Sequence, residues 1–295
     1  MADWQGLIDE LDPERPVVIA GATASGKSEL ALRIAETQGG VIVNADALQV
    51  WSCWRVLSAR PGPRDLARAP HLLYGHLPCG ADYSVGHWLR EVAGVLEGGA
   101  RPIVVGGTGL YLSALTGGLA EVPAVPAEVR AEADARLAAR GLAAMLAEVD
   151  AATAARLDPM NPARVQRAWE VLRATGRGLA EWQEAQAAPL LPPDRAQALV
   201  LAAGRDWLNA RIDRRFDAMM AEGALDEVRA ILPIWNPSAL WARAIGAPEL
   251  VAHLMGAMSL ADATSAAKLA SRRYAKRQRT WLRSRMAAWR QVAPA

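Results

Sequence analysis

The stretch GATASGKS, residues 21–28, decides the fold. It has a glycine, four residues, a second glycine, a lysine and a serine, which is the pattern of a phosphate-binding loop. An apolar run at residues 16–20 precedes it, and SELALRIAE, residues 28–36, follows with apolar residues at helical spacing. Because strand, loop and helix are the context that this motif requires, we expect a buried parallel strand that leads into a phosphate site.

Each part of this loop has a physical role. A glycine-rich turn exposes backbone N–H groups, and the following helix adds the positive end of its dipole. Lys27 is one of only three lysines among 33 basic residues, and it supplies a full positive charge, while the Ser28 hydroxyl is expected to help hold Mg²⁺. The residues predicted to bind phosphate are Gly21, Ala22, Thr23, Ala24, Ser25, Gly26, Lys27 and Ser28.

Two further strands are expected to end beside the loop. Residues 41–43 form an apolar run before Asp46, and residues 102–105 form another before Gly106-Gly107-Thr108. Open α/β sheets bind ligands at the carboxyl ends of their strands, so Asp46 and Thr108 should share an edge with the loop. A helix cap and a turn residue are the alternatives for these two positions. A nucleoside triphosphatase usually has a second acid after its central strand, and none follows residue 105.

The alternation of strands and helices predicts an α/β fold, a P-loop NTPase-like parallel sheet core. Further elements are expected at residues 71–74 and 198–201, as strands, and from Val85 to Val95, as a helix capped by Ser84. Residues 126–186 lack strand signals and show helical spacing, broken near Gly141 and Gly176. We therefore predict a first part of the core at 1–122, a small all-helical insert at 123–190, and the rest of the core with basic helices at 191–295.

The charge is divided unevenly along the chain, although the net charge is only +2. Residues 263–295 carry nine basic residues and no acid, so the remainder has 24 basic and 31 acidic residues. A basic, helical tail with interleaved Tyr274 and Trp281 suits a nucleic-acid backbone better than a membrane surface. The start of the chain has no long apolar run, and Cys53 and Cys79 are expected to be free thiols, so we predict a cytoplasmic protein.

Two arginine clusters are candidates for phosphate contacts. Arg164 and Arg167 lie three residues apart in the insert and would share a helix face. The second cluster is RIDRR, residues 211–215, and one of its arginines could clamp a phosphate through its guanidinium group. Surface charge is the alternative interpretation of the first cluster.

Taken together, the motifs resemble those of the tRNA dimethylallyltransferases, and the resemblance covers nearly the whole chain. The matching segments include GATASGKS, NADALQVW at 44–51, PIVVGGTGLYLSALTGGL at 102–119, LDPMNPARVQRAWEVL at 157–172 and RRYAKRQRTWLR at 272–283. GGTGLYL and RRYAKRQRTWLR are the most specific of these. Residues 50–60 depart from the usual family pattern, and Ala163 stands where glutamine is usual.

The resemblance implies an enzyme that transfers a dimethylallyl group from dimethylallyl diphosphate to N6 of the adenosine at position 37, beside the anticodon, in tRNAs that read codons starting with U. The loop and Arg211 would then hold diphosphate with Mg²⁺, Asp46 would be the general base, and Thr108 would hold the amino group or the leaving phosphate. The implied partners are tRNA and dimethylallyl diphosphate, with no membrane, and the enzyme is expected to be a monomer. The implied tRNA contacts are Asp46, Ala47, Leu48, Gln49, Thr108, Arg130, Ala163, Arg164, Val165, Gln166 and Arg167.

Three other functions remain open at this point. An adenylate prenyltransferase would run the same chemistry on free AMP, although it would need neither the insert nor the basic tail. A small-molecule kinase would use ATP, which the missing acid after residue 105 argues against. A non-catalytic RNA-binding protein would bind tRNA in a salt-dependent way and form no product.

Overall fold

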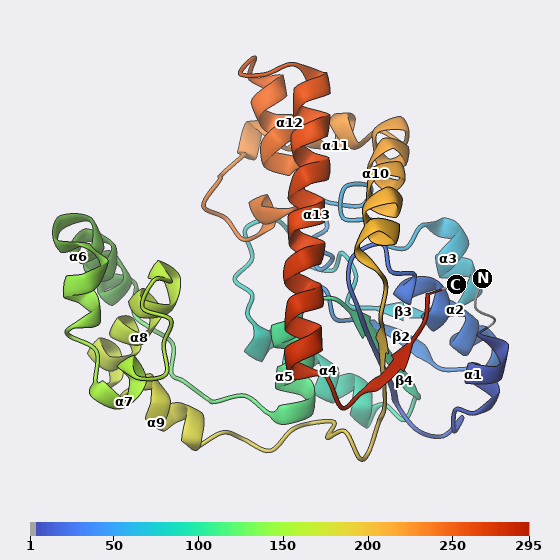
Figure 1. Cartoon of the computed structure of the whole chain (residues 1–295), viewed down its shortest axis with the longest axis horizontal. Helices are drawn as coiled ribbons and strands as arrows, with labels where there is room; N and C mark the ends of the chain where they lie inside the picture. The colour runs from blue at the N-terminus through green and yellow to red at the C-terminus, as the bar shows by residue number, and fades with distance from the viewer. Residues whose placement is uncertain (1–3, 295) are drawn as a thin grey trace. The chain divides into compact units, whose positions relative to one another are not determined.

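One parallel sheet organises the larger part of the molecule (Figure 1). The computed structural model of the chain describes residues 4–294, and within them six strands lie in the order β3-β2-β4-β1-β5-β6, with every neighbouring pair parallel. The strands are β1 (Val17–Gly21), β2 (Val41–Asn44), β3 (His71–Leu72), β4 (Pro102–Gly106), β5 (Gln197–Leu201) and β6 (Arg290–Val292). All residues of β1, β2 and β4 are buried, as expected of strands covered on both faces. The predicted α/β fold is confirmed.

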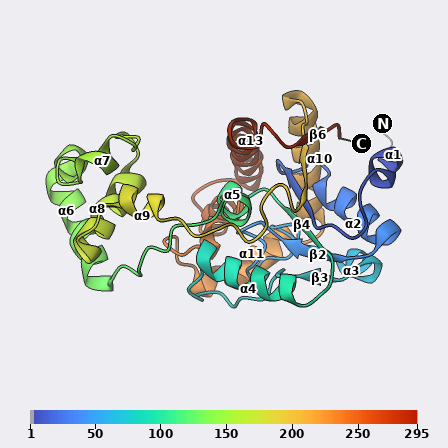
Figure 2. The same cartoon turned by 90° about the horizontal axis from the view of Figure 1, so that it is seen from below.

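Helices cover both faces of this sheet, and Figure 2 shows α2 and α4 on opposite sides of β2 and β4. Val17 and Ile19 of β1 share a buried cluster with residues of α1 and α2, whereas Val18 and Ala20 share another with residues of α4 and α5. These helices are α1 (Gln5–Asp9), α2 (Lys27–Gln38), α4 (Val85–Glu97) and α5 (Gly109–Gly117), while α3 (Pro63–Arg68) follows β2. Ser84 caps α4 as predicted, because its side chain accepts a hydrogen bond from the N–H of His87.

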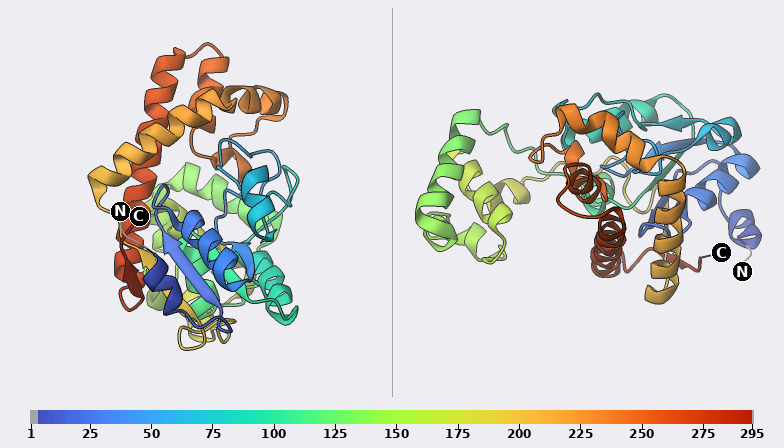
Figure 3. Two further views of the ribbon diagram at one scale, coloured as in Figure 1. Left: turned by 90° about the vertical axis from the view of Figure 1, so that its right-hand side faces the viewer. Right: turned by 90° about the horizontal axis from the view of Figure 1, so that it is seen from above.

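A second group of helices follows β5. It consists of α10 (Arg205–Ala221), α11 (Ala224–Ile231), α12 (Ala247–Leu254) and α13 (Leu260–Arg285), with short 3₁₀ turns at Leu232–Ile234 and Trp241–Arg243. Figure 3 shows α10 and α13 packed against each other. These helices bury the tryptophan-rich segment after β2: the indole N–H of the fully buried Trp54 donates to the carbonyl of Trp241 at 2.8 Å. The segment is therefore part of a hydrophobic core.

The chain divides into two compact units. One runs up to Thr116 and resumes at Leu191, and the other is Gly117–Leu190. The second unit contains only helices: α6 (Ala127–Leu146), α7 (Ala151–Ala154), α8 (Pro162–Thr175) and α9 (Leu179–Glu184). Its core joins α6 to α8 through residues such as Met145 and Trp169, and Gly176, in the left-handed conformation, ends α8.

Two features of the fold differ from the predictions. The end of the chain is not entirely helical, because Arg290–Val292 pairs with β5 as strand β6. Cys53 and Cys79 are not free thiols, since they form a disulfide with their Cα atoms 6.3 Å apart. Their separation of 26 residues hid this proximity, which arises because Trp51 pairs with Leu77 in a parallel bridge. In the part of the chain that the structure describes, no helix is long and apolar enough to cross a membrane.

Gly106 allows two strand ends to meet. A Cβ atom at this position would lie 2.0 Å from the carbonyl oxygen of Ala45, beyond the end of β2. We predict that Gly106→Ala lowers the free energy of unfolding by about 2–3 kcal/mol through overpacking, measured by chemical denaturation. Gly94→Ala is the matched control, because Gly94 lies in α4 with no atom near the added Cβ, and alanine should gain up to about 1 kcal/mol there. Equal stability of the two variants would contradict this account of the strand ends.

Candidate active site at the carboxyl edge of the sheet

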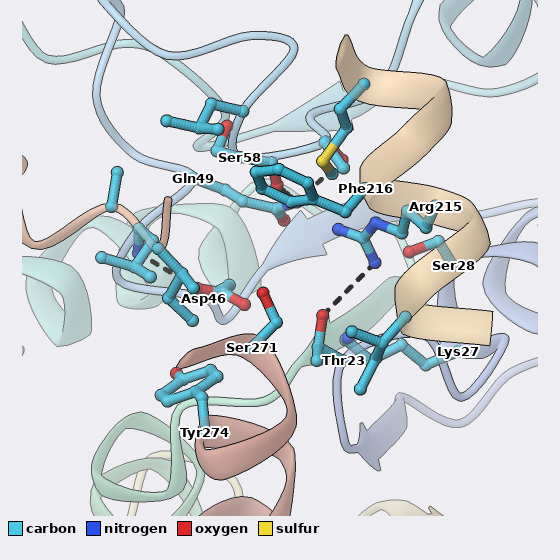
Figure 4. A pocket seen from close by; sticks show the side chains of 17 residues that line it. Thr23, Lys27, Ser28, Asp46, Gln49, Ser58, Arg215, Phe216, Ser271 and Tyr274 are labelled. Carbon is cyan, nitrogen blue, oxygen red and sulfur yellow. Dashed lines mark hydrogen bonds between the residues drawn. The ribbon is translucent and has the colours of Figure 1, made fainter. Parts of the chain in front are cut away.

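Three neighbouring strands end beside one pocket, which residues of the phosphate loop and Asp46 line, whereas Thr108 does not line it. Because β4 lies between β1 and β2, the phosphate loop, Asp46 and Thr108 all follow adjacent carboxyl ends. Lys27, Ser28 and Asp46 line this pocket together with residues of α10 and α13 (Figure 4). The structure thus brings the loop and Asp46 together, as the strand pattern predicts.

The phosphate loop ends in a turn that leads directly into α2. Gly26 has φ of +97°, a left-handed conformation that favours glycine, and it immediately precedes α2. The side chains of Ala22 and Ala24 belong to a buried cluster that includes Ile212 of α10 and Ala275 of α13. Since the first N–H groups of a helix lack partners within the helix, the start of α2 offers donors for an anion.

Two further features of the loop suit an anion. The Ser25 hydroxyl is buried and has no hydrogen-bond partner among residues 4–294, so a phosphate oxygen would satisfy it. Burial lowers the pKa of Lys27 to about 8, with Arg215 contributing, while the Asp46 carboxylate acts in the opposite direction. A bound anion would favour the charged amine and repay part of this burial cost.

Asp46 is fixed by its neighbours. The side chain of Asn44, fully buried at the end of β2, accepts from the Asp46 N–H at 2.8 Å and donates to its carbonyl at 3.0 Å. One carboxylate oxygen of Asp46 accepts from the N–H of Leu48 at 3.0 Å. The carboxylate can therefore accept a proton from a ligand in the pocket while its position stays defined.

Thr108 bridges the ends of β4 and β2. Its hydroxyl oxygen accepts from the N–H of Ala47 at 2.9 Å, and its own N–H donates to the carbonyl of Ala45 at 3.3 Å. The hydroxyl of Tyr274 on α13 also interacts with Thr108. Burial and the Asp46 carboxylate raise the pKa of Tyr274 well above its usual range, so this hydroxyl stays protonated.

Arg215 of the predicted cluster at residues 211–215 lies in the pocket, and not Arg211, which the resemblance implies. Its guanidinium group donates to the Thr23 hydroxyl at 3.3 Å (Figure 4). Arg211 instead donates to the carbonyl of Ala24 at 3.0 Å, stacks on Trp207, and lines only a second cavity, which Lys27, Ser28 and Arg215 also line. The sequence could have indicated Arg215, because this residue shares a helix face with Ile212 and Phe216, which are buried.

Other residues of the pocket lie in segments for which the sequence predicted no part in the phosphate site, among them the RRYAKRQRTWLR motif of α13. Ser271 and Tyr274 of α13 line it, and Gln278 lies one turn further along the same face. Across the pocket, Leu57 belongs to a wall that Glu227 of α11 fixes, because its carboxylate accepts from three consecutive N–H groups at residues 55–57. The sequence shows that these α13 residues share one helix face, but which part of the protein that face contacts depends on tertiary packing.

The predicted RNA contacts fall into two groups. Ala47, Leu48 and Gln49 follow Asp46, and Leu48 and Gln49 line the pocket. The side-chain N–H groups of Gln49 donate to the carbonyls of Ser58 and Ala59, at 2.8 and 2.9 Å, so Gln49 also holds the pocket wall.

The second group lies in the helical unit. Arg130 on α6, and Ala163 and Arg164 at the start of α8, are exposed. Gln166 and Arg167 interact with acids of the same unit, Gln166 with Asp134 and Arg167 with Glu170. Val165 is fully buried in the core of this unit, so its side chain is not at the surface, contrary to a direct contact with RNA.

A phosphate loop that faces a fixed carboxylate across a pocket, on a parallel sheet, is typical of enzymes of the P-loop class. Comparison with known proteins narrows the class. The IPP transferase family matches residues 49–285, more than half of the chain, and the isopentenyl transferase family matches residues 15–72. The chain belongs to the IPP transferase family.

Relatives and solved structures agree with this membership. The chain is 66% identical over 285 residues to a tRNA dimethylallyltransferase of Cereibacter sphaeroides, covering 97% of this chain and 91% of that protein. It is similar to the crystal structure of a tRNA isopentenylpyrophosphate transferase from Bacillus halodurans, with a TM-score of 0.66, 29% identity, and coverage of 95% and 90%. A eukaryotic dimethylallyltransferase acting on tRNA shares the fold, with a TM-score of 0.79, 24% identity, and coverage of 95% and 74%.

Lys27 gives the site a pH dependence. Its pKa of about 8 means that the amine is charged below this pH and neutral above it. We predict that the affinity for an alkyl diphosphate, which is fully ionised in this range, falls as the pH rises through about 8, by up to about tenfold per unit. Calorimetric titration of the alkyl diphosphate from about pH 7 to about pH 10, on both sides of this pKa, tests the prediction. Lys27→Met should bind weakly at every pH, and Lys276→Met, at an exposed position of α13, should keep the wild-type profile; a flat wild-type profile would refute the assignment.

Arg215 and Arg211 make a matched pair one helical turn apart. Because charge-assisted hydrogen bonds contribute about 1.5–3 kcal/mol, we predict that Arg215→Gln weakens binding of an alkyl diphosphate about 10- to 100-fold. Arg211→Gln should have a clearly smaller effect, since this side chain is engaged with Ala24 and Trp207. Calorimetry on both variants decides the assignment, and a larger loss for Arg211→Gln would restore Arg211 as the main diphosphate ligand.

Proposed function

We propose that this protein is a tRNA dimethylallyltransferase, which transfers the dimethylallyl group of dimethylallyl diphosphate to N6 of an adenosine beside the anticodon. The observation that carries the proposal is the placement of Asp46 opposite Lys27 and Arg215 in one pocket, on a family member whose β4 is followed by glycines and Thr108 rather than by an acid. In this arrangement Asp46 can act as a base on the adenosine, while Lys27 and Arg215 hold the diphosphate leaving group of the donor.

The pocket has a part for each half of the allylic donor. Lys27, the start of α2 and Arg215 supply positive charge and N–H donors for diphosphate. Leu57, Phe216 and Met219 add an apolar wall, where a dimethylallyl group would be kept from water. The combination of a cationic and an apolar part supports an alkyl diphosphate over a nucleoside triphosphate.

The oxygen donors present also fit Mg²⁺. Ser28 lines the pocket, and within residues 4–294 no three histidine, cysteine or acidic side chains gather into a metal site of their own. Mg²⁺ commonly takes one or two protein oxygens and completes its shell with substrate phosphates and water. When bound through Ser28 and the diphosphate, the ion would neutralise charge on the leaving group.

The chemical step is a substitution at the allylic carbon. The bond between this carbon and the diphosphate oxygen breaks, and its electron pair leaves with the diphosphate, where Lys27 and Arg215 stabilise the developing charge. The lone pair of the adenine N6 forms the new nitrogen–carbon bond, and Asp46 accepts the proton that N6 loses. Thr108 orients the amino group or the departing oxygen from the neighbouring strand end.

Features outside the pocket favour a tRNA acceptor. The exposed basic residues of α13 suit a phosphate backbone, and they are Arg273, Lys276, Arg277, Arg283 and Arg285. The helical unit presents Arg130 and Arg164 at its own surface, for contacts with an anticodon stem-loop. An adenosine at position 37 would have to leave the loop's stack to bring N6 to Asp46.

Free AMP is the competing acceptor. The isopentenyl transferase family matches residues 15–72, a range that includes the phosphate loop and Asp46 but neither the helical unit nor α13. The basic face of α13 and the helical unit would then have no role, which favours tRNA. We further propose that the enzyme acts as a cytoplasmic monomer on tRNAs that read codons beginning with U.

The assignment of Asp46 is tested by Asp46→Asn, which keeps an acceptor for the Leu48 N–H. We predict that prenylation of an unmodified anticodon stem-loop by dimethylallyl diphosphate and Mg²⁺ falls at least about 100-fold, because the base is lost. RNA affinity should be unchanged, as measured by fluorescence anisotropy, and nucleoside mass spectrometry identifies the product.

Asp82→Asn, at an exposed position, is the control and should retain wild-type turnover. If the wild-type protein prenylates AMP faster than the stem-loop, the protein is an adenylate prenyltransferase and not a tRNA enzyme. Failure of folded wild-type protein on every unmodified tRNA of its source would reject it.

A further inference from the structure

Gln278 is a buried polar side chain on α13 that the chemistry above does not use. Only 6% of its surface is exposed. Both ends of its amide are engaged: the oxygen accepts from the N–H of Thr23 at 2.8 Å, and the nitrogen donates to the carbonyl of Gly107 at 3.0 Å. Buried amides whose polar atoms are all satisfied fix the groups around them, because an unpaired partner would cost about 1–3 kcal/mol.

Two partners of Gln278 belong to the two loops of the site, and a third is the hydroxyl of Tyr274 in the pocket. Thr23 lies in the phosphate loop, where its hydroxyl accepts from Arg215, and Gly107 directly precedes Thr108. Gly107 leaves room for this contact, since a Cβ atom there would lie 2.2 Å from the amide nitrogen of Gln278. One amide therefore sets the spacing of the loops that would hold the leaving group and the nucleophile.

The helix that carries Gln278 is also the most basic element of the chain. Lys268 and Arg272 anchor it by ion pairs with Asp217 and Asp213 of α10. Arg273 and Lys276 are exposed and have no acidic partner within the residues that the structure describes. Thus α13 presents cations to solvent on some faces and builds the pocket with another.

We propose that Gln278 is a positioning residue that couples the binding of RNA by the basic faces of α13 to the geometry of the phosphate loop. The inference rests on the proposed function. Any displacement of α13 by RNA moves the Thr23 N–H and the Gly107 carbonyl with it, so the loops adopt their diphosphate-binding spacing best when the helix is held. Coupling between two binding sites is reciprocal, so a bound diphosphate must improve RNA binding by the same factor.

The test measures this coupling at equilibrium and needs no turnover. A fluorescent anticodon stem-loop is titrated with the full-length protein, with and without saturating inorganic diphosphate and Mg²⁺, at constant ionic strength. We expect diphosphate to tighten RNA binding at least about fivefold in the wild type. Gln278→Met, which keeps the shape of the side chain and loses its hydrogen bonds to Thr23, Gly107 and Tyr274, should abolish the change while leaving RNA affinity without diphosphate as in the wild type.

Two further variants guard against a merely structural effect. Gln278→Glu keeps the acceptor for Thr23 and loses the donor to Gly107, so it should retain only part of the coupling. Gln291→Met makes the same substitution in β6, at a glutamine whose side-chain amide donates to the carbonyl of Trp289, and it should keep the full coupling. In turnover assays Gln278→Met should lower kcat on the order of 10- to 100-fold, with the KM for RNA unchanged.

The wild type and Gln278→Met decide between the outcomes. Equal coupling in both proteins, or no coupling in the wild type, would overturn the inference. Intact coupling without any prenyl transfer would reject the proposed function and leave the role of Gln278 standing, so the two failures are distinguishable.

Discussion

The pairing of β4 between β1 and β2 is the constraint on which the site depends. It requires Gly106, because the carbonyl of Ala45 leaves no room for a side chain. The pairing places the phosphate loop, Asp46 and Thr108 at the ends of adjacent strands, and all three strands are buried. Rigid strands can hold reacting groups more closely than loops alone, which is what a substitution between two bound substrates needs.

The electrostatics of the pocket follow from this placement. Lys27 and Arg215 lie in the pocket with Asp46 facing them, and burial lowers the pKa of both cations. Neutral Lys27 would be a poor ligand for diphosphate, so the same burial that strengthens each charge interaction also limits the pH range of binding. Buried Tyr274 keeps its proton and adds a neutral donor beside Thr108. This family member has the phosphate-loop pattern of a triphosphatase, but its acid, Asp46, follows β2 and not β4.

Much of this site could be predicted from the sequence, since the loop, Asp46 and Thr108 each follow a recognisable apolar strand. The residues from α10 and α13 were harder, because a helix shows which residues share a face but not what that face meets. Arg211 and Arg215 illustrate this: both belong to one basic cluster, and packing turns only Arg215 toward Thr23. Cys53 and Cys79 were mispredicted because a pairing between Trp51 and Leu77 brings distant segments together.

The central claim is that the phosphate loop grips a leaving diphosphate and not an energy source. Phosphorus NMR of one mixture containing the protein, unmodified tRNA, Mg²⁺, dimethylallyl diphosphate and ATP follows both donors at once. The account predicts that inorganic diphosphate appears in step with prenylated tRNA while the ATP resonances stay constant. Accumulation of ADP and phosphate, with dimethylallyl diphosphate unchanged, would contradict it.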